Sequence, residues 1–233
     1  MNYLDSLNEP QRQGVINTEG PTMIIAGAGS GKTRVLTYRI AYLIQEKDVD
    51  PFNILALTFT NKAAKEMRDR IEKVVGTEAR NLWMGTFHSI FARILRAEAS
   101  KIGFQSNFTI YDTDDSKSLI KNIVKEMKLD DKVYKPNVVL NRISGAKNRL
   151  ISWKEYNENP MIRAEDESAA KPHMGKIYKT YVQRCFKSDA MDFDDLLFNT
   201  NVLFREHLDV LNKYQQRFRY VLVDEFQDTN YSQ

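Results

Sequence analysis

The apolar positions of the chain fall into two alternating patterns. Short, nearly continuous apolar runs predict buried strands, at 21–27, 52–60, 82–87 and 220–223. After each of the first three runs, apolar residues recur at helical spacing and predict helices, at 33–47, 61–75 and 88–103. Continuous apolar strands that alternate with helices are typical of a parallel sheet covered on both faces, so the pattern predicts an α/β fold.

The middle of the chain interrupts this alternation. From about Asp114 to Arg184 the apolar spacing is helical, and no segment there indicates a parallel strand. We therefore expect a helical insertion at 104–188 within an α/β domain formed by 1–103 and 189–233. Two polar stretches of the insertion predict loops, "SWKEYNENP" at 152–160 and a mobile loop at 163–173.

Composition narrows the class of protein. The 233 residues are 42% hydrophobic and 28% charged, as in an ordinary globular protein. The single cysteine, Cys185, excludes a disulfide within the chain. No apolar run approaches the roughly 20 residues of a membrane-spanning helix, and the N-terminus lacks the basic start and apolar core of a signal peptide. We expect a cytoplasmic protein with no membrane partner.

The net charge of +3 is too small to indicate a nucleic-acid partner by itself. The charge is uneven, however, because residues 104–188 hold 16 Lys and Arg against 11 Asp and Glu, a balance of +5. The remaining residues hold 18 against 20, a balance of −2. A basic middle within a slightly acidic frame is consistent with an inserted segment that has its own partner.

A glycine-rich segment between the first predicted strand and helix matches the phosphate-loop pattern G-x-x-x-x-G-K-[S/T]. It reads Ala26, Gly27, Ala28, Gly29, Ser30, Gly31, Lys32 and Thr33, with Ala in the first position. Its main-chain N–H groups and the start of the next helix would face an anion. Lys32 can reach the β- and γ-phosphates of ATP, and Thr33 can ligate Mg²⁺. The alternative is a glycine-rich turn with a surface lysine.

Two adjacent acids follow the last predicted strand. Asp224 is suited to bind Mg²⁺ opposite the Thr33 hydroxyl, because this hard cation prefers oxygen ligands. Glu225 is placed to orient and deprotonate the water that hydrolysis requires. An acid pair can also be a solvated strand end, but the phosphate loop in the same chain favours ATP hydrolysis.

The phosphate loop and the acid pair belong to a longer series of motifs. In chain order these are "LNEPQ", "AGAGSGKT", "TFTNKAAKEM", "GTFHS", "DFDDLL" and "DEFQDTN". The series resembles that of the superfamily 1 DNA helicases of the UvrD/PcrA/Rep group and covers nearly the whole chain. The resemblance implies a RecA-like P-loop NTPase domain of an ATP-dependent DNA helicase, which moves 3′→5′ on single-stranded DNA in repair or replication.

The resemblance also implies roles around the nucleotide. Gln11 would hydrogen-bond the adenine edge, since its amide offers both a donor and an acceptor. Arg34 would lie flat against the base, and Gln227 would sense the γ-phosphate and couple it to movement. The alternatives are a helix-start glutamine for Gln11 and a helix-surface arginine for Arg34.

DNA would bind at the carboxyl ends of two strands, according to the same resemblance. The residues implied are Thr58, Phe59, Thr60 and Asn61 after one strand, and Thr86, Phe87, His88 and Ser89 after the next. An aromatic ring there can stack on a base, and the hydroxyls and imidazole can donate to phosphates. The alternatives are a core position for Phe59 and a helix cap for His88.

We expect other side chains that could act chemically to have structural roles. Asp194 or Asp195 of "DFDDLL" is expected to start a helix or join domains rather than bind a metal, since Mg²⁺ already has Thr33 and Asp224. Cys185 and the histidines His173 and His207 are expected to have no catalytic role.

Members of this helicase group continue well beyond "DEFQDTN", so we expect the chain to be an N-terminal fragment. The second motor domain of such proteins supplies arginines to the ATP site, and the fragment would need it for unwinding at duplex junctions. In this class the strand after the acid pair inserts between the acid-pair strand and the phosphate-loop strand, and without it we expect the sheet to have a gap or a rearranged centre. Two alternatives stay open, the motor of a helicase–nuclease and, for the fragment, a module that binds ATP and DNA without hydrolysis.

Overall fold

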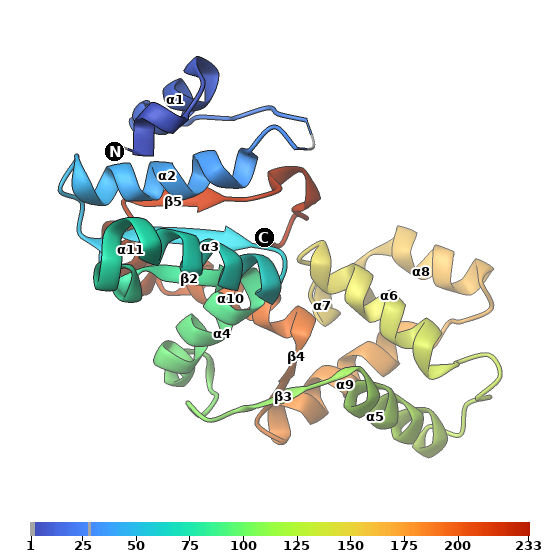
Figure 1. The fold of residues 1–233 in the computed structure, drawn as a ribbon. Coiled ribbons are helices and arrows are strands. Elements are labelled where there is room, and N and C mark those ends of the chain that lie inside the picture. Colours follow the sequence, from blue (N-terminus) through green and yellow to red (C-terminus); the bar gives the residue numbers. More distant parts are fainter. Residues whose placement is uncertain (1–2, 28) are drawn as a thin grey trace. The chain divides into compact units, whose positions relative to one another are not determined.

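The structure is a computed structural model that describes residues 3–27 and 29–233. It is a mixed α/β chain that divides into two compact units (Figure 1). The sheet unit comprises Met1–Ile90 and Asn212–Asp228, and the helical unit comprises Phe91–Leu211 and Thr229–Gln233. The boundaries of these units differ from the domain boundaries expected from the sequence, 103/104 and 188/189. The expected domain boundaries remain a prediction.

The sheet unit is built on three parallel strands. They are β1 (Ile54–Thr58), β2 (Trp83–Thr86) and β5 (Tyr220–Val223), in the order β2-β1-β5. Every residue of β1 is buried, as expected for a central strand of a covered parallel sheet. The register pairs Thr58 with Thr86 and Leu57 with Val223, so the carboxyl ends of all three strands lie at one edge. The α/β class and these three predicted strands are confirmed.

Two helices cover this sheet in the predicted places, α2 (Lys32–Gln45) and α3 (Asn61–Val75). A further helix, α1 (Glu9–Ile16), was not predicted and packs against α2. The side chain of Thr60 caps α3 by accepting from the N–H of Ala63, which explains why the helix begins directly after β1. The apolar stripes of α2 and α3 meet the strands in one buried cluster, which includes Ile40, Leu43, Ile54, Met67, Ile71 and Leu222.

The predicted strand at 21–27 is wrong. The segment has no strand structure, and Met23 and Ile25 are 72% and 91% exposed. A strand needs a neighbour that completes its hydrogen bonds. β5 pairs with β1 on one side, and among the described residues no strand pairs with its other side. The apolar run therefore has no ladder to join.

Two helices run from one unit into the other along the chain. α4 (Phe87–Glu98) begins earlier than predicted and is extended by a 3₁₀ turn at Ala99–Ile102. Gly103 then ends it with φ of 78°, a conformation that glycine adopts without strain. α11 (Leu208–Arg217) leads back towards β5.

The helical unit contains six further helices and one short strand pair. The helices are α5 (Thr113–Glu126), α6 (Pro136–Asn148), α7 (Trp153–Glu158), α8 (Pro160–Ser168), α9 (Met174–Lys187) and α10 (Phe193–Glu206). β3 (Thr109–Tyr111) and β4 (Ala190–Asp192) pair in parallel beside them. The expectation of helices without a parallel strand between Asp114 and Arg184 is confirmed. The core includes Ile120, Ile143, Tyr178, Tyr181 and the buried Cys185.

The loop predicted at 152–160 is wrong, and the loop predicted at 163–173 is wrong over its first part. The stretch 152–160 contains α7, because Ser152 and Glu155 form a reciprocal capping box that starts a helix. The first part of 163–173 belongs to α8, which Pro160 opens and the Asn159 side chain caps. Only the residues after Ser168 form turns before α9.

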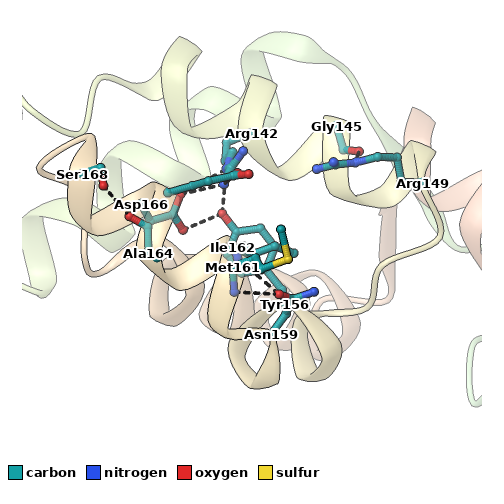
Figure 2. Close-up of polar contacts among 11 residues, drawn as sticks. Arg142, Gly145, Arg149, Tyr156, Asn159, Met161, Ile162, Ala164, Asp166 and Ser168 are labelled. Carbon is teal, nitrogen blue, oxygen red and sulfur yellow. Dashed lines mark hydrogen bonds and ion pairs between the residues drawn. The ribbon is translucent and has the colours of Figure 1, made fainter.

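A polar network fixes α8 to α6 and α7 (Figure 2). The Arg142 Nε of α6 donates to the Tyr156 hydroxyl at 2.8 Å and to Asp166 Oδ1 at 3.1 Å. The Tyr156 hydroxyl in turn donates to Asp166 Oδ2 at 2.7 Å. Asp166 is buried, so these bonds replace the water that its carboxylate loses on folding. At the solvent side, Arg142 also pairs with Glu165 at 2.9 Å.

We predict that Tyr156→Phe lowers the free energy of unfolding of the helical unit by about 1–3 kcal/mol, because a buried carboxylate loses a hydrogen bond. Denaturant-induced unfolding followed by hydrogen exchange in α6–α8 measures this loss. Glu165→Gln changes a 61% exposed partner of the same arginine and is expected to cost less than about 0.5 kcal/mol. Equal stability of Tyr156→Phe and the unmodified chain contradicts the prediction.

The "DFDDLL" motif forms a buried charge cluster at the start of α10. Lys147 of α6 is 1% exposed and contacts Asp192 Oδ2 at 2.7 Å and Asp195 Oδ1 at 2.8 Å. Asp192 caps α10 in a reciprocal box with Asp195, so the helix-start reading of Asp195 is confirmed. Burial, with the nearby Asp192 carboxylate, raises the pKa of Asp195. Burial opposes the ionised form of Asp192 too, but the ammonium of Lys147 outweighs it and lowers that pKa.

Within the described part of the chain, no helix combines the length and the apolar character that crossing a membrane requires.

Candidate nucleotide-binding site

The phosphate-loop segment forms a compact turn at the start of α2. The Ser30 hydroxyl and main-chain N–H both donate to the Gly27 carbonyl, at 2.6 and 3.3 Å. Gly29 and Gly31 have φ of 77° and 88°, which side chains with a Cβ rarely adopt. Ala26 precedes this turn and is half-buried, while Ala28 lies outside the described residues. The turn therefore depends on glycine at positions 29 and 31.

Lys32 and Thr33 are the first two residues of α2. The main-chain N–H groups of a helix start have no partners within the helix and carry partial positive charge. No side chain caps this end of α2. Lys32 and Thr33 are both partly buried, so they lie beside an end of the helix that favours an anion.

The acid pair lies directly after β5. The main-chain N–H of Asp224 donates to the Leu57 carbonyl at 2.9 Å, which ties the pair to the carboxyl end of β1. Glu225 then turns the chain with φ of 53°. This left-handed conformation costs roughly 1–2 kcal/mol at a residue with a side chain, and such strain is common at functional sites.

The acid pair and the phosphate loop meet although 193 residues separate them. Lys32 Nζ lies 3.4 Å from Glu225 Oε2, and the Gln227 amide donates to the same oxygen. The hydrogen bond from Gln227 lowers the pKa of Glu225 most, and the ammonium of Lys32 lowers it further. Burial and then the Glu225 carboxylate raise the pKa of Asp224. The structure thus brings together Lys32, Glu225 and Gln227, with Thr33 and Asp224 as their chain neighbours.

Gln11 also contacts the phosphate loop. Its Nε2 donates to the Ser30 carbonyl at 2.9 Å, and its Oε1 accepts from the N–H of Asn8 at 3.2 Å. Gln11 is therefore a helix-start glutamine and a neighbour of the loop at once. Arg34 has other partners than the phosphate loop. Its Nη2 donates to the Ser6 hydroxyl at 2.7 Å, and its guanidinium lies over the Tyr38 ring.

The residues implied in DNA binding lie at the carboxyl ends of β1 and β2, which are neighbours in the sheet. Thr58 is buried and donates to the Thr60 carbonyl, whereas Thr60, Asn61 and Ser89 are exposed. The Phe59 and Phe87 rings pack at 5.6 Å. Phe87 is buried and Phe59 partly buried, while Thr86 and His88 are also partly buried. At the start of α4, the main-chain N–H of Ser89 donates to the Thr86 hydroxyl, and the Ser89 hydroxyl donates to the Thr86 carbonyl.

Sequence reasoning missed three residues that shape this site. Asn8 caps α1 in a reciprocal box with Gln11, and its spacing of three residues before a glutamine could have revealed it. Ser6 binds Arg34, and Arg39 binds the Gly14 carbonyl at 2.8 Å. No pattern in the sequence indicates either of these contacts.

The chain is similar to one known family and to curated proteins. The chain matches the UvrD/REP helicase N-terminal domain family over residues 7–233. It is 48% identical over 228 residues to the ATP-dependent DNA helicase PcrA of Staphylococcus epidermidis, covering 98% of this chain and 30% of that protein. It is 46% identical over 231 residues to the ATP-dependent DNA helicase PcrA of Staphylococcus aureus, covering 99% and 31%.

The chain thus spans about 30% of the length of these curated relatives. The matched region includes the phosphate loop, the acid pair and both strand ends described above. The recognition made from the six motifs is confirmed, and the chain belongs to the UvrD/REP helicase N-terminal domain family.

Proposed function

We propose that the chain is a RecA-like motor domain that binds Mg²⁺ and ATP. The observation that carries this proposal is the 3.4 Å contact between Lys32 and Glu225. This contact brings the glycine-rich loop and the start of α2 next to the acid pair, at the carboxyl edge of the sheet. A lysine beside unpaired helix N–H groups suits the phosphates of a nucleotide. The printed name of the relatives, ATP-dependent DNA helicase, supports the same ligand.

Each residue of the site has a proposed role. The phosphates would be bound by main-chain groups of the loop that runs from Ala26 through Gly27, Ala28, Gly29 and Ser30 to Gly31. Gln11 and Arg34 would contact the adenine base. The hydroxyl of Thr33 and the carboxylate of Asp224 would hold Mg²⁺, which neutralises phosphate charge when bound. Glu225 would orient the attacking water and accept its proton as a carboxylate general base. Gln227, already bonded to Glu225, would respond to the γ-phosphate.

Lys32 and Glu225 would separate when the nucleotide binds. In this structure the lysine pairs with the carboxylate, and both side chains remain about one-third or more exposed. Phosphate oxygens carry more charge than one carboxylate and would attract the ammonium away from it. Glu225 would then be released for its proposed role beside water.

Single-stranded DNA would cross the carboxyl ends of β1 and β2. Thr60, Asn61 and Ser89 are exposed there, and the partly buried Phe59 is backed by Phe87, which would hold its ring for stacking on a base. Thr58, Thr86 and His88 would complete this contact with the phosphates. In the whole protein, we propose 3′→5′ translocation and unwinding of duplex junctions, with a second motor domain completing the ATP site.

The proposed nucleotide site predicts that Mg²⁺ strengthens ATP binding through Asp224. We expect a fluorescent ATP analogue to bind the chain more tightly with Mg²⁺ than with EDTA. Asp224→Asn should reduce this gain at least about tenfold, since even changes to outer-shell partners of a metal cost roughly 10–100-fold in its affinity.

The matched control is Asp228→Asn, which changes an exposed acid of the same segment and should keep the full gain. An unchanged Mg²⁺ effect in Asp224→Asn would remove Asp224 from the metal site. Absence of any ATP binding by the unmodified chain would overturn the proposed function itself.

A further inference from the structure

Two main-chain groups hold the amide of Gln11 in one orientation. Its Oε1 accepts from the N–H of Asn8, and its Nε2 donates to the carbonyl of Ser30. A flipped amide would place N–H against N–H and carbonyl against carbonyl, so the flip is disfavoured. An amide nitrogen has two N–H groups and an amide oxygen two lone pairs. One donor and one acceptor therefore remain beyond these two bonds.

That remaining pair distinguishes the two purines. The exposed edge of adenine offers an N6–H donor beside the N7 acceptor, whereas guanine offers the O6 and N7 acceptors. An amide fixed in orientation can satisfy both groups of adenine. Against guanine, its oxygen would face the O6 acceptor. Selection of the base therefore depends on how firmly the Gln11 side chain, and the helix that carries it, are held.

The helix α1, which carries Gln11, lies beside α2 (Figure 1). Leu4, Val15 and Val35 are buried in this contact, and Tyr3, Leu7, Tyr38 and Tyr42 pack against them partly buried. At Gly14 the two helices approach closely, because a Cβ placed there would lie 3.0 Å from Val35 Cγ1. Apolar packing is non-directional, so a buried polar bond between the helices adds a directional constraint on the position of α1.

Arg39 supplies such a bond. It lies on α2, is 9% exposed, and its Nη1 donates to the Gly14 carbonyl at 2.8 Å. Gly14 belongs to the last turn of α1, where carbonyls have no partner within the helix and a cation is favourable. Burial lowers the pKa of the guanidinium, and the charge of Glu19 opposes this. The same helix α2 begins with Lys32. One helix therefore carries both the lysine proposed to bind phosphates and the arginine that holds the end of α1.

We propose that Arg39 is a positioning residue for base selection, which acts by holding α1 through Gly14 so that the oriented Gln11 amide meets adenine. This inference rests on the proposed function, since it assumes that the loop binds ATP. Arg39 itself does not touch the nucleotide in this assignment. Its loss should therefore change the preference for the base and not the attraction for phosphates.

The test compares the affinities of the chain for Mg²⁺ complexes of ATP, GTP and inorganic tripolyphosphate. In Arg39→Met we expect ATP affinity to fall about tenfold, the discrimination of roughly one hydrogen bond. Affinities for GTP and tripolyphosphate should change less than about twofold, so the ATP-to-GTP ratio falls about tenfold. Arg39→Lys keeps a charged donor and should recover part of the ratio.

The matched control is Arg68→Met, because Arg68 also donates from a partly buried guanidinium to a main-chain carbonyl, that of Met84 at 3.0 Å. This variant should keep the ratio of the unmodified chain. Gly14→Ala displaces the same contact without changing the arginine, and it replaces Arg39→Met if that variant does not fold. It should lower the ratio as well.

Two results would overturn the inference. One is an unchanged ATP-to-GTP ratio in Arg39→Met and Gly14→Ala. The other is an equal loss of affinity for all three ligands, which would give Arg39 a purely structural role. If the unmodified chain binds tripolyphosphate and ATP equally well, base selection by Gln11 fails while the phosphate site stands. If it binds none of the ligands, the proposed function fails first.

Discussion

Lys32→Ala is expected to weaken ATP binding by about 10²-fold or more while the chain stays folded. A hydrogen bond to a charged group contributes roughly 1.5–3 kcal/mol, and tenfold in affinity corresponds to about 1.4 kcal/mol. An ammonium that reaches two phosphates therefore accounts for a loss of this size. Lys32 is 33% exposed and its side-chain partner is Glu225, so alanine creates no buried cavity there. Equilibrium titration with a fluorescent ATP analogue measures the effect.

The control for Lys32→Ala removes an equal charge elsewhere. Lys121 is exposed on α5 of the helical unit, and Lys121→Ala should bind ATP as the unmodified chain does. Circular dichroism of both variants verifies that the helices are retained. Unchanged ATP affinity in Lys32→Ala would assign the glycine-rich segment to an ordinary turn, the alternative that its sequence leaves open.

Lys147→Ala is expected to destabilise the helical unit by about 3–5 kcal/mol, the usual cost of removing one partner from a buried ion pair. The substitution leaves Asp192 and Asp195 with no cation between them, and both carboxylates are buried. It also removes the cation that lies over the Tyr181 ring at 5.0 Å. Hydrogen exchange of α6, α9 and α10 measures this loss separately from the sheet unit.

Lys101→Ala provides the comparison for Lys147→Ala. Lys101 pairs with Asp209 at 2.8 Å, a distance close to those of Lys147, but both side chains of this pair are exposed. An exposed pair contributes about 0–1 kcal/mol, so this variant should unfold almost as the unmodified chain does. If the two lysine variants have equal stability, burial does not govern the contribution of the Lys147 cluster.

The helical spacing and the apolar runs predicted most of the sheet unit because both report burial. They failed at 21–27, where the apolar residues have no strand to pair with and burial tendency alone forms no ladder. They also missed β3 and β4, whose three residues each are too few to produce a periodic pattern. α7 could have been predicted, since Ser152 and Glu155 have the spacing of a capping box.

The candidate site was predictable where a local motif defines the chemistry. The glycines around Lys32 and the acids at 224 and 225 each form a short recognisable pattern. Their meeting across 193 residues depends on strand order in the sheet, which alternation of strands and helices does not specify. Arg39 could not be predicted, because its partner is a main-chain carbonyl that any residue at position 14 would offer.

The single cysteine of the chain has a practical consequence for labelling. Cys185 is buried in the core of the helical unit, and burial raises the pKa of its thiol to about 12. Maleimide dyes react with the thiolate, of which such a thiol has almost none near neutral pH. A cysteine introduced at exposed Asn61 or Ser89 would therefore take up a fluorophore selectively in the folded protein. The native sequence can be used without first removing Cys185, so a dye beside the proposed DNA track could report strand binding directly.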